Sequence, residues 1–372
     1  MKYYIIAGEA SGDLHASNLI NELKLLDADA AFRCWGGDLM QAQGATIVKH
    51  YEELAFMGFV EVLLNLKTIL SNIKFCKNDI LKYKPDVLIL VDYPGFNLRI
   101  AEFAKANGIK VFYYISPTVW AWHESRVETI KKYVDKMFVI LPFEKEFYAK
   151  HNCHVEYAGH PLTDVINDWK RNNEDVILWR KENVITDKPI IAILPGSRKQ
   201  EVYRMFPIML EACDKYKGHQ PIVAGATSIP IEYYQQFFGG RDVKILFNQT
   251  YSILNNAEAA LVKSGTSTLE AALLHTPEVV CYKANTISYS IAKMVTNIRF
   301  ISLVNLIMDK EVVKELIQNN MTVENIRKEL DDLLLNPDKR MAMLQDYQEL
   351  RIKLGIDGAS KSIAQLMWKL IK

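Results

Sequence analysis

Four short segments of this sequence place glycine and polar side chains directly after an apolar run, and they are the first candidates for chemistry. They are GEASGD from Gly8, DYPGFN from Asp92, LPGSR from Leu194 and KSGTSTLE from Lys263. Glycine adopts backbone conformations that other residues avoid, so a bound molecule can approach the backbone amides of such a segment. The carboxylates, hydroxyls and guanidinium in these segments are groups that move protons or hold phosphate.

The LPGSR segment predicts a phosphate site. It follows the apolar run 190–194 and precedes residues of helical character, so Ser197 and Arg198 stand at the start of a helix. Amides at the amino end of a helix attract anions, and an arginine beside them adds charge-assisted hydrogen bonds. The alternative is an ordinary surface arginine at a helix start. No Gly-Lys-Ser/Thr follows, so the segment is not a P-loop.

The KSGTSTLE segment also reads as a turn that opens a helix. Ser264, Gly265 and Thr266 are small, so a diphosphate can approach the amides at the start of that helix. Glu270, about one turn further, is placed to accept hydrogen bonds from ribose hydroxyls. A plain helix cap is the alternative, and the absence of G-x-S-x-G excludes a nucleophile elbow. The second half of the chain is therefore predicted to bind a nucleoside diphosphate.

Two aspartates stand out in the first half. Asp92 follows the apolar run 87–91, which places its carboxylate at the carboxyl edge of a predicted parallel sheet, where ligands of open α/β sheets bind. We interpret Asp92 as a general base, as a cap that holds its loop, or as both. Asp13, directly after Gly12, is interpreted as the cap of the helix that follows it.

Further polar and aromatic residues of the first half are expected to form the wall of an active cleft. They are Glu9, Ser11 and Gly12 in GEASGD, and Trp120 and His123 in SPTVWAWH. Sugar rings stack on aromatic surfaces, but packing tryptophans are equally common, and a tight turn with a cap is the alternative for GEASGD. The favoured hypothesis is a two-lobed α/β enzyme with GEASGD and LPGSR on the two sides of its cleft.

Patterns for cofactors and metals are weak. G-x-G-x-x-G is absent after the first apolar run, which disfavours a nicotinamide cofactor. His123-Glu124 lacks a second histidine at the zincin spacing. The five cysteines are scattered without a C-x-x-C pair, which indicates neither a disulfide framework nor a zinc knuckle and fits a reducing cytosol. We expect no metal and no cofactor.

Short apolar runs alternate with amphipathic segments, as is typical of parallel sheets covered by helices on both faces. The first half has such segments at 3–7, 13–26, 87–91, 98–106, 111–115, 126–133 and 137–141. The second has apolar runs at 190–194, 221–224, 243–247, 259–262 and 279–282. The pattern pauses after His160-Pro161, so two sheets are predicted. From Glu311 to Lys372 the strand signal disappears and helices are expected.

Length and composition agree with two soluble domains. The 372 residues exceed the roughly 250 to 300 at which one core stops growing. Apolar residues make up 49% and charged residues 24%, and the net charge of +1 gives no global attraction to nucleic acid. The amino terminus lacks a signal-peptide core, and no apolar stretch is long enough to span a membrane. We predict domains at 1–165 and 166–349, with a linker inside 162–187.

Residues 56–77 form an unusually apolar segment of predicted helix. Its exposed apolar residues are expected to be Val60, Leu63, Leu66, Ile69 and Leu70, and three lysines lie close by. One interpretation is a long amphipathic helix packed on the sheet. The other is a helix whose apolar side faces lipid acyl chains while the lysines meet anionic headgroups.

Taken together, these segments resemble the lipid-A-disaccharide synthase family, inverting glycosyltransferases with two Rossmann-like domains (the GT-B fold). The resemblance covers nearly the whole chain and is carried, in order, by GEASGD, ELAFMGFVEVL, KPDVLILVDYPGFN, YYISPTVWAW, LPFEKEFY, GHP, ILPGSRKQEV, SGTSTLE and SLVNLI. Relatives on the same fold share the SGTSTLE-like turn but lack SPTVWAW and DYPGFN. This ordered set of motifs is specific to the family.

The resemblance implies transfer of 2,3-diacylglucosamine from its UDP derivative to the 6-hydroxyl of 2,3-diacylglucosamine 1-phosphate, which gives a β-1,6 disaccharide and UDP. Asp92 would be the base, and Arg198 with residues 264–266 would stabilise the leaving diphosphate. Glu270 would hold the ribose, and Asn305 would lie near the nucleotide. The rivals are another UDP-sugar enzyme on this fold, such as an epimerase or a transferase with an unacylated acceptor, and a non-catalytic two-lobed binding protein.

The resemblance also implies where the protein works in the cell, and two residues depart from the family's pattern. Acylated substrates favour the membrane interpretation of 56–77 and a peripheral enzyme on the inner face of the cytoplasmic membrane of a Gram-negative-type cell. The fold implies that a helix from about residue 350 onward packs on the first domain or on a partner, and a homodimer is left open. Gly95 and Val304 stand where many members have Asp and Pro. No nucleic-acid partner is expected.

Overall fold

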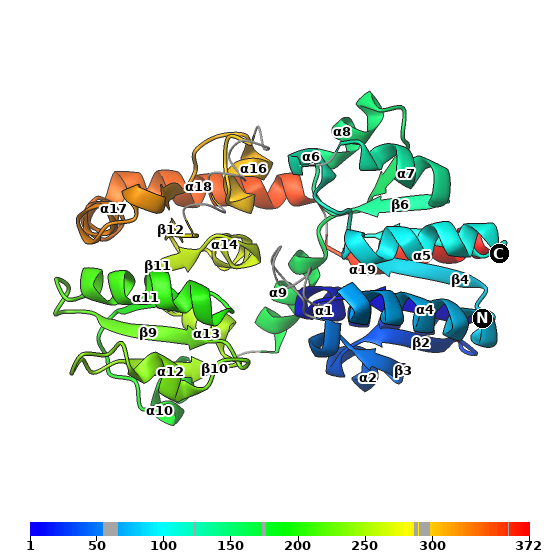
Figure 1. Cartoon of the computed structure of the whole chain (residues 1–372). Coiled ribbons are helices and arrows are strands. Elements are labelled where there is room, and N and C mark those ends of the chain that lie inside the picture. The colour runs from blue at the N-terminus through cyan, green and yellow to red at the C-terminus, as the bar shows by residue number, and fades with distance from the viewer. Residues whose placement is uncertain (55–65, 123, 173–175, 286–288, 290–297, 356) are drawn as a thin grey trace. The chain divides into compact units, whose positions relative to one another are not determined.

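The computed structural model describes residues 1–54, 66–122, 124–172, 176–285, 289, 298–355 and 357–372 (Figure 1). Contacts divide the chain into two compact units. Unit 1 consists of Met1–Asp164 and Gly355–Lys372, and unit 2 of Val165–Leu354. Each unit is built around one parallel sheet. The expected fold class, two parallel sheets with alternating helices, is therefore confirmed.

The sheet of unit 1 has seven strands among the described residues, in the order β3-β2-β1-β4-β5-β6-β7. The strands are β1 Lys2–Ala7, β2 Ala31–Gly36, β3 Thr46–His50, β4 Val87–Val91, β5 Lys110–Tyr114, β6 Lys136–Val139 and β7 Val155–Tyr157. All five residues of β4 are buried, because this central strand is covered on both faces. The sheet is therefore the core from which the loops of unit 1 project.

Helices cover both faces of this sheet. They are α1 Ala10–Leu26, α2 Asp38–Ala42, α4 Leu66–Tyr83, α5 Pro94–Ala106, α6 Val119–Trp122, α7 Arg126–Tyr133, α8 Glu144–Lys150 and α19 Ala359–Ile371, with the 3₁₀ helix η1 Tyr51–Leu54. Residues of α1 and α19 pack on one face of the sheet, and those of α4, α5 and α7 pack on the other. Successive residues of β1 point alternately into these two cores, as the strand period requires.

The last helix belongs to unit 1 although the chain reaches it through unit 2. Ile363, Ala364 and Met367 of α19 join the core that α1 also covers. The carboxylate of Asp164 accepts hydrogen bonds from the backbone amides of Gly358, Ala359 and Ser360, at 2.6, 3.3 and 2.9 Å. These bonds satisfy amides at the amino end of α19 that have no partner within the helix.

Unit 2 has a six-stranded parallel sheet among its described residues, in the order β10-β9-β8-β11-β12-β13. The strands are β8 Ile190–Leu194, β9 Gln220–Gly225, β10 Lys244–Phe247, β11 Ala257–Lys263, β12 Glu278–Tyr282 and β13 Lys314–Ile317. Its helices are α9 Pro161–Arg171, which starts in unit 1, α10 Val176–Glu182, α11 Lys199–Cys213, α12 Ile231–Gln235, α13 Thr250–Asn255, α14 Thr266–Leu273, α16 Leu303–Met308, η2 Gln318–Asn320, α17 Val323–Leu335 and α18 Pro337–Leu354. One of its cores joins α11 and α17 to β8 and β11.

The strands that sequence analysis missed are mostly at sheet edges. The expectation that strands end before Glu311 is wrong, because β13 pairs in parallel with β12. Its sequence KELI has two charged residues followed by two apolar ones, so it contains no apolar run long enough to predict a strand. The strands β3 and β7 are also edge strands. Within the described part of the chain, no helix combines the length and apolarity needed to cross a membrane.

Candidate active site

The order of strands reverses at one place in each sheet, and this topology locates the site. In unit 1 it lies between β1 and β4, and in unit 2 between β8 and β11. In open parallel sheets, ligands bind beyond the carboxyl ends of the strands at such a switch point. The loops that leave these four strand ends are GEASGD, DYPGFN, LPGSR and KSGTSTLE. The four segments chosen for their chemistry are therefore the four at the switch points.

Asp92 lies directly beyond β4 in a strained backbone. Its φ is +45° and that of Tyr93 is +49°, in the left-handed region that residues with a side chain rarely adopt. The backbone carbonyl of Asp92 accepts hydrogen bonds from the Asn97 amide, at 2.7 Å, and from the Tyr113 hydroxyl. These contacts hold the backbone turn at Asp92 in place. Strain of this kind is concentrated at functional sites.

The environment of Asp92 suits proton transfer at neutral pH. Burial raises the pKa of its carboxyl to about 7, and the negative charge of Glu9 adds to the rise. Glu9 comes from the loop after β1, whose last residue Ala7 pairs with Val91. A base whose pKa lies near the working pH is both ionised and strong enough to take a proton. The structure therefore brings Glu9 and Asp92 close together at the switch point of unit 1.

The GEASGD segment is more helical than expected. The helix α1 begins at Ala10, so Ser11 and Gly12 lie in its first turn. A Cβ atom on Gly8 would lie 2.5 Å from Cγ of Tyr93, so only glycine fits under that ring. This close contact joins the loop after β1 to the loop after β4.

The interpretation of Asp13 as the cap of its own helix is wrong. Asp13 lies inside α1, and its carboxylate accepts hydrogen bonds from the amides of Gly37 (2.7 Å), Leu39 (3.1 Å) and Met40 (3.2 Å). It therefore caps the amino end of α2 and ties α1 to the end of β2. The sequence could not show this, because the partners are separated from Asp13 by 24 or more residues.

The segment after β5 lies against an acid of α8 that sequence analysis missed. Glu144 of α8 is fully buried, accepts a hydrogen bond from the Leu141 amide at 3.0 Å, and has its pKa raised to about 7 by that burial. Ser116 also interacts with this carboxyl. Glu144 therefore anchors the SPTVWAW segment. The only feature of the sequence that pointed to this residue was its place in the LPFEKEFY motif. The ring of Trp120 packs edge-on against Phe143, with centroids 5.0 Å apart, and His123 lies outside the described residues.

In unit 2, the LPGSR loop is organised by Glu201, which sequence analysis had not placed in the site. Gly196 has a φ of +112°, and the backbone amide of Ser197 donates to Oε2 of Glu201 at 3.1 Å. Nη1 of Arg198 lies 3.8 Å from Oε1 of Glu201, and Nζ of Lys263 lies 3.0 Å from the same oxygen. Two cations from neighbouring strand ends thus converge at the start of α11.

The KSGTSTLE turn is fixed from both sides. Gly265, with a φ of +156°, precedes the first residue of α14, and the Thr268 hydroxyl donates to its carbonyl at 2.8 Å. The hydroxyl of Ser264 donates to the carbonyl of Ile301 at 2.8 Å, whereas Thr266 is exposed. A rigid turn of small residues at a helix amino end matches what a diphosphate requires.

Glu270 lies in the second turn of α14, and its side chain is partly buried. Its Oε1 accepts a hydrogen bond from the Tyr251 hydroxyl at 3.2 Å, and burial raises the pKa of its carboxyl. Ser267 also interacts with this carboxyl. A contact between Glu270 and a ribose stays a prediction.

Asn305 holds its own loop. Its side chain is fully buried, and Oδ1 accepts from the amides of Val312 and Val313 at 2.8 and 3.0 Å. Nδ2 donates to the Val313 carbonyl and to Glu315, at 2.8 and 2.9 Å. Because these bonds occupy both ends of the amide, Asn305 supports the segment whose Ile301 carbonyl Ser264 contacts. A place near the nucleotide stays a prediction. Val304 beside it is also fully buried.

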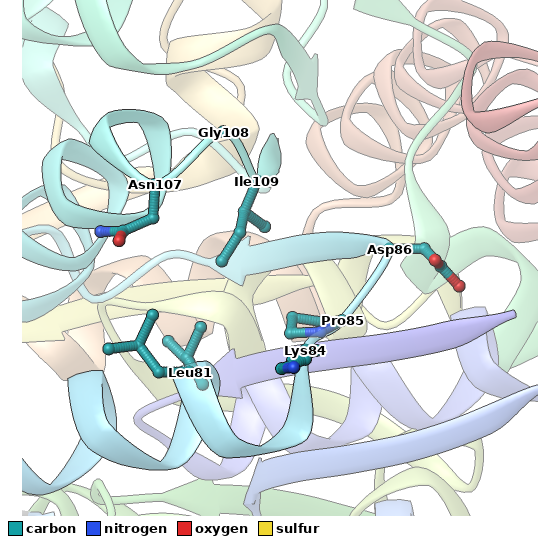
Figure 2. A pocket seen from close by; sticks show the side chains of 8 residues that line it. Leu81, Lys84, Pro85, Asp86, Asn107, Gly108 and Ile109 are labelled. Carbon is teal, nitrogen blue, oxygen red and sulfur yellow. The ribbon is translucent and has the colours of Figure 1, made fainter.

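A hollow of about 460 Å³ lies at the opposite end of the sheet of unit 1, lined by Leu81, Lys84, Pro85, Asp86, Asn107, Gly108, Ile109 and Ile80 (Figure 2). Its residues precede β4 and β5, so it lies at the amino ends of these strands, away from Asp92. We therefore do not place the reaction there. Among the described residues, no cluster of three or more His, Cys, Asp or Glu side chains could hold a metal ion.

The fold and these two switch points define a class: a protein with two Rossmann-like domains of the GT-B type. The UDP-GlcNAc 2-epimerase of Neisseria meningitidis superposes with a TM-score of 0.71 over 99% of this chain and 100% of that chain, at 15% identity. A glycosyltransferase of Rickettsia africae superposes with a TM-score of 0.60 over 100% of this chain and 98% of that one, at 12% identity. At these identities the likeness shows the fold alone.

The sequence identifies the family within that class. The model of the lipid-A-disaccharide synthetase family matches residues 3–369. The lipid-A-disaccharide synthase of Syntrophus aciditrophicus is 39% identical over 99% of this chain and 97% of its own length. That of Myxococcus xanthus is 36% identical over 99% and 97%. The chain belongs to the lipid-A-disaccharide synthase family, which confirms the resemblance.

Proposed function

We propose that this protein joins UDP-2,3-diacylglucosamine to 2,3-diacylglucosamine 1-phosphate and releases UDP. Asp92 takes the proton of the acceptor 6-hydroxyl as that oxygen attacks the anomeric carbon from the face opposite UDP. The new C–O bond forms while the bond to the diphosphate breaks, and UDP leaves with the electron pair. Arg198 and the amides at the start of α14 stabilise the charge that develops on the diphosphate.

The single observation that carries this proposal is the chemistry at the two switch points. One holds a carboxylate whose pKa is raised to about 7, and the other holds an arginine beside a rigid turn at a helix start. A group transfer from a nucleoside diphosphate needs both a base for the acceptor and a binding site for the leaving group. Membership of the family, shown across nearly the whole chain, supports a lipid A disaccharide as the product.

The direct test incubates the purified protein with the two acylated monosaccharides and measures disaccharide and UDP by mass spectrometry. We expect both products in equal amounts. A folded protein that makes neither would refute the proposed activity. Conversion of UDP-GlcNAc into an epimer, or transfer to an unacylated acceptor only, would instead support the rival enzymes on this fold.

We further propose that the protein works on the inner face of the cytoplasmic membrane, with α4 and the segment before it as the contact. Leu66 and Leu70 of α4 have 45% and 58% of their surface exposed, whereas Ile69 packs against the core. Val60 and Leu63 lie outside the described residues. Exposed leucines beside lysines suit a surface of acyl chains and anionic headgroups. A homodimer is also compatible with this proposal.

Changing Leu66 and Leu70 together to serine is expected to weaken binding to vesicles of anionic phospholipid without loss of stability, because both side chains already face solvent. Vesicle co-sedimentation and thermal melting measure the two effects. The control changes Leu81, which is 45% exposed at the other end of the same helix, to serine. Equal vesicle binding by the double variant and the wild type would contradict the membrane proposal for α4.

A further inference from the structure

The carboxylate of Glu201 occupies a position in unit 2 that an anion would occupy. Its side chain is only 16% exposed. Oε2 accepts from the Ser197 amide, and Oε1 lies 3.0 Å from Nζ of Lys263 and 3.8 Å from Nη1 of Arg198. A backbone amide at a helix start and two cations are the groups that bind phosphate in other proteins. Glu201 therefore acts as a built-in counter-anion.

The position of this carboxylate is set by the turn before it. A Cβ atom on Gly196 would lie 2.4 Å from Oε2 of Glu201, so the glycine is needed for the carboxylate to pack there. The backbone of Gly196, at a φ of +112°, also favours glycine. The position of the carboxylate thus sets the positions of Arg198 and Lys263, which both lie near its Oε1 atom.

Lys263 stands where it can reach a ligand of the KSGTSTLE turn. It is the last residue of β11, beside β8 in the sheet, and 23% of its side chain is exposed. Its Nζ lies 3.8 Å from the place that a Cβ atom on Gly265 would occupy, so the ammonium group is next to the residue that precedes α14. A phosphate at the start of this helix would come within reach of the same ammonium group.

The net charge of this cluster is positive, so the cluster can attract an anion. Arg198 and Lys263 contribute two positive charges and Glu201 one negative charge, so the three side chains together carry +1. An ammonium group has three donors, and Glu201 is one partner. Glu201 therefore neutralises only one of the two cations.

We propose that Lys263 binds the diphosphate of the nucleotide-sugar donor and that Glu201 is a positioning residue, which holds Lys263 and Arg198 ready for it. This inference rests on the proposed function and adds a residue to its donor site. As the bond between the sugar and the diphosphate breaks, negative charge grows on the diphosphate. Lys263 stabilises that charge together with Arg198, without having to move into place.

The test measures UDP binding by titration calorimetry and uridine binding by displacement, for the wild type, K263M and K263R. We expect K263M to weaken UDP binding about tenfold or more, because a charge-assisted hydrogen bond is lost, and to leave uridine binding unchanged. K263R keeps the charge and is expected to restore most of the affinity. K199M is the matched control, since the Lys199 ammonium lies over the Tyr233 ring, 5.6 Å from its centroid.

A second arm separates binding from a merely structural role. In a protein that carries E201Q, K263M is still expected to weaken UDP binding if Lys263 touches the diphosphate. If the effect of K263M disappears in that background, Lys263 is only the counter-ion of Glu201 and the inference is overturned. Equal weakening by K199M, or unchanged UDP affinity in K263M, would also overturn it.

The same experiment distinguishes this inference from the function on which it rests. A wild-type protein that does not bind UDP refutes the donor site as a whole, whereas a wild type that binds UDP equally well as K263M refutes only the role of Lys263. Thermal melting checks that each variant is folded. Should K263M fail to fold, K263Q keeps a polar side chain of similar length and takes its place in both arms.

Discussion

Replacement of Asp92 by asparagine is expected to lower kcat about a thousandfold and to leave the affinity for UDP unchanged. Asparagine has nearly the same size and can keep the loop, but its amide cannot take a proton from the acceptor hydroxyl. The residues proposed to bind UDP belong to unit 2, whereas Asp92 belongs to unit 1. Disaccharide formation and titration calorimetry with UDP measure the two quantities.

The matched control for this substitution is Asp86→Asn. Asp86 precedes the same strand at its amino end, beside the hollow in Figure 2, and accepts a hydrogen bond from the Lys2 amide at 2.7 Å. Asparagine retains an oxygen for that bond, so kcat should not change. Full activity of D92N would remove Asp92 as the base, and loss of UDP binding in D92N would indicate a wider structural effect.

The pKa of Asp92 adds a pH dependence to this prediction. Because the base must be ionised, kcat/KM is expected to rise as pH increases through about 7 in the wild type. The stability of the fold depends on pH in the opposite direction. The pKa of the folded protein lies above the usual value of about 4, so the neutral carboxyl stabilises the fold at low pH. That contribution is complete below about pH 4 and is lost as pH rises through about 7.

D92N should therefore be more stable than the wild type near pH 8, with a smaller difference near pH 5, because asparagine never ionises. Urea denaturation at the two pH values measures the difference in the free energy of unfolding. A larger advantage of the variant near pH 5 would contradict the raised pKa of Asp92.

Replacement of Arg198 by methionine is expected to lower kcat/KM about a hundredfold or more. The guanidinium stands at the start of α11, held near Oε1 of Glu201, and 54% of its side chain is exposed toward solvent. Its loss removes a charge-assisted contact to the diphosphate that strengthens as UDP leaves. Steady-state kinetics with varied donor concentration measures the change.

K199M serves as the control for Arg198 as well, because it removes one positive charge from the next residue. We expect its kcat/KM to stay near that of the wild type. A similar loss in both variants would mean that the general positive potential, and not the position of Arg198, attracts the donor. Unchanged kinetics in the Arg198 variant would exclude it from the donor site.

The elements with strong local patterns were predictable. The central strands β1, β4, β8 and β11 are apolar on both faces, because helices cover both sides of a parallel sheet. Short edge strands such as β3 and β13 were not, since a strand with one neighbour and one exposed face lacks a continuous apolar run. Strand order itself cannot be read from local patterns, because it depends on how each helix crosses the sheet.

The residues of the candidate site also divide into those that could be predicted from the sequence and those that could not. Asp92, Arg198 and the turn around Gly265 were visible because glycine and polar residues directly after an apolar run mark a strand end. The contact between Glu201 and Lys263 could not be predicted. Glu201 lies in α11 and Lys263 is the last residue of β11, and the two meet because β8 pairs with β11.

By itself, the sequence determined the α/β class, the four loops that lie at the switch points of the two sheets and the family to which the chain belongs. Only the tertiary structure decided that Asp13 caps α2, that Asn305 is engaged by its own loop, and that Glu144 anchors the segment after β5. The physical reason is the range of the interactions. Strand and helix signals come from neighbouring residues, whereas the partners of a buried polar group are chosen by packing between segments that are far apart in the chain.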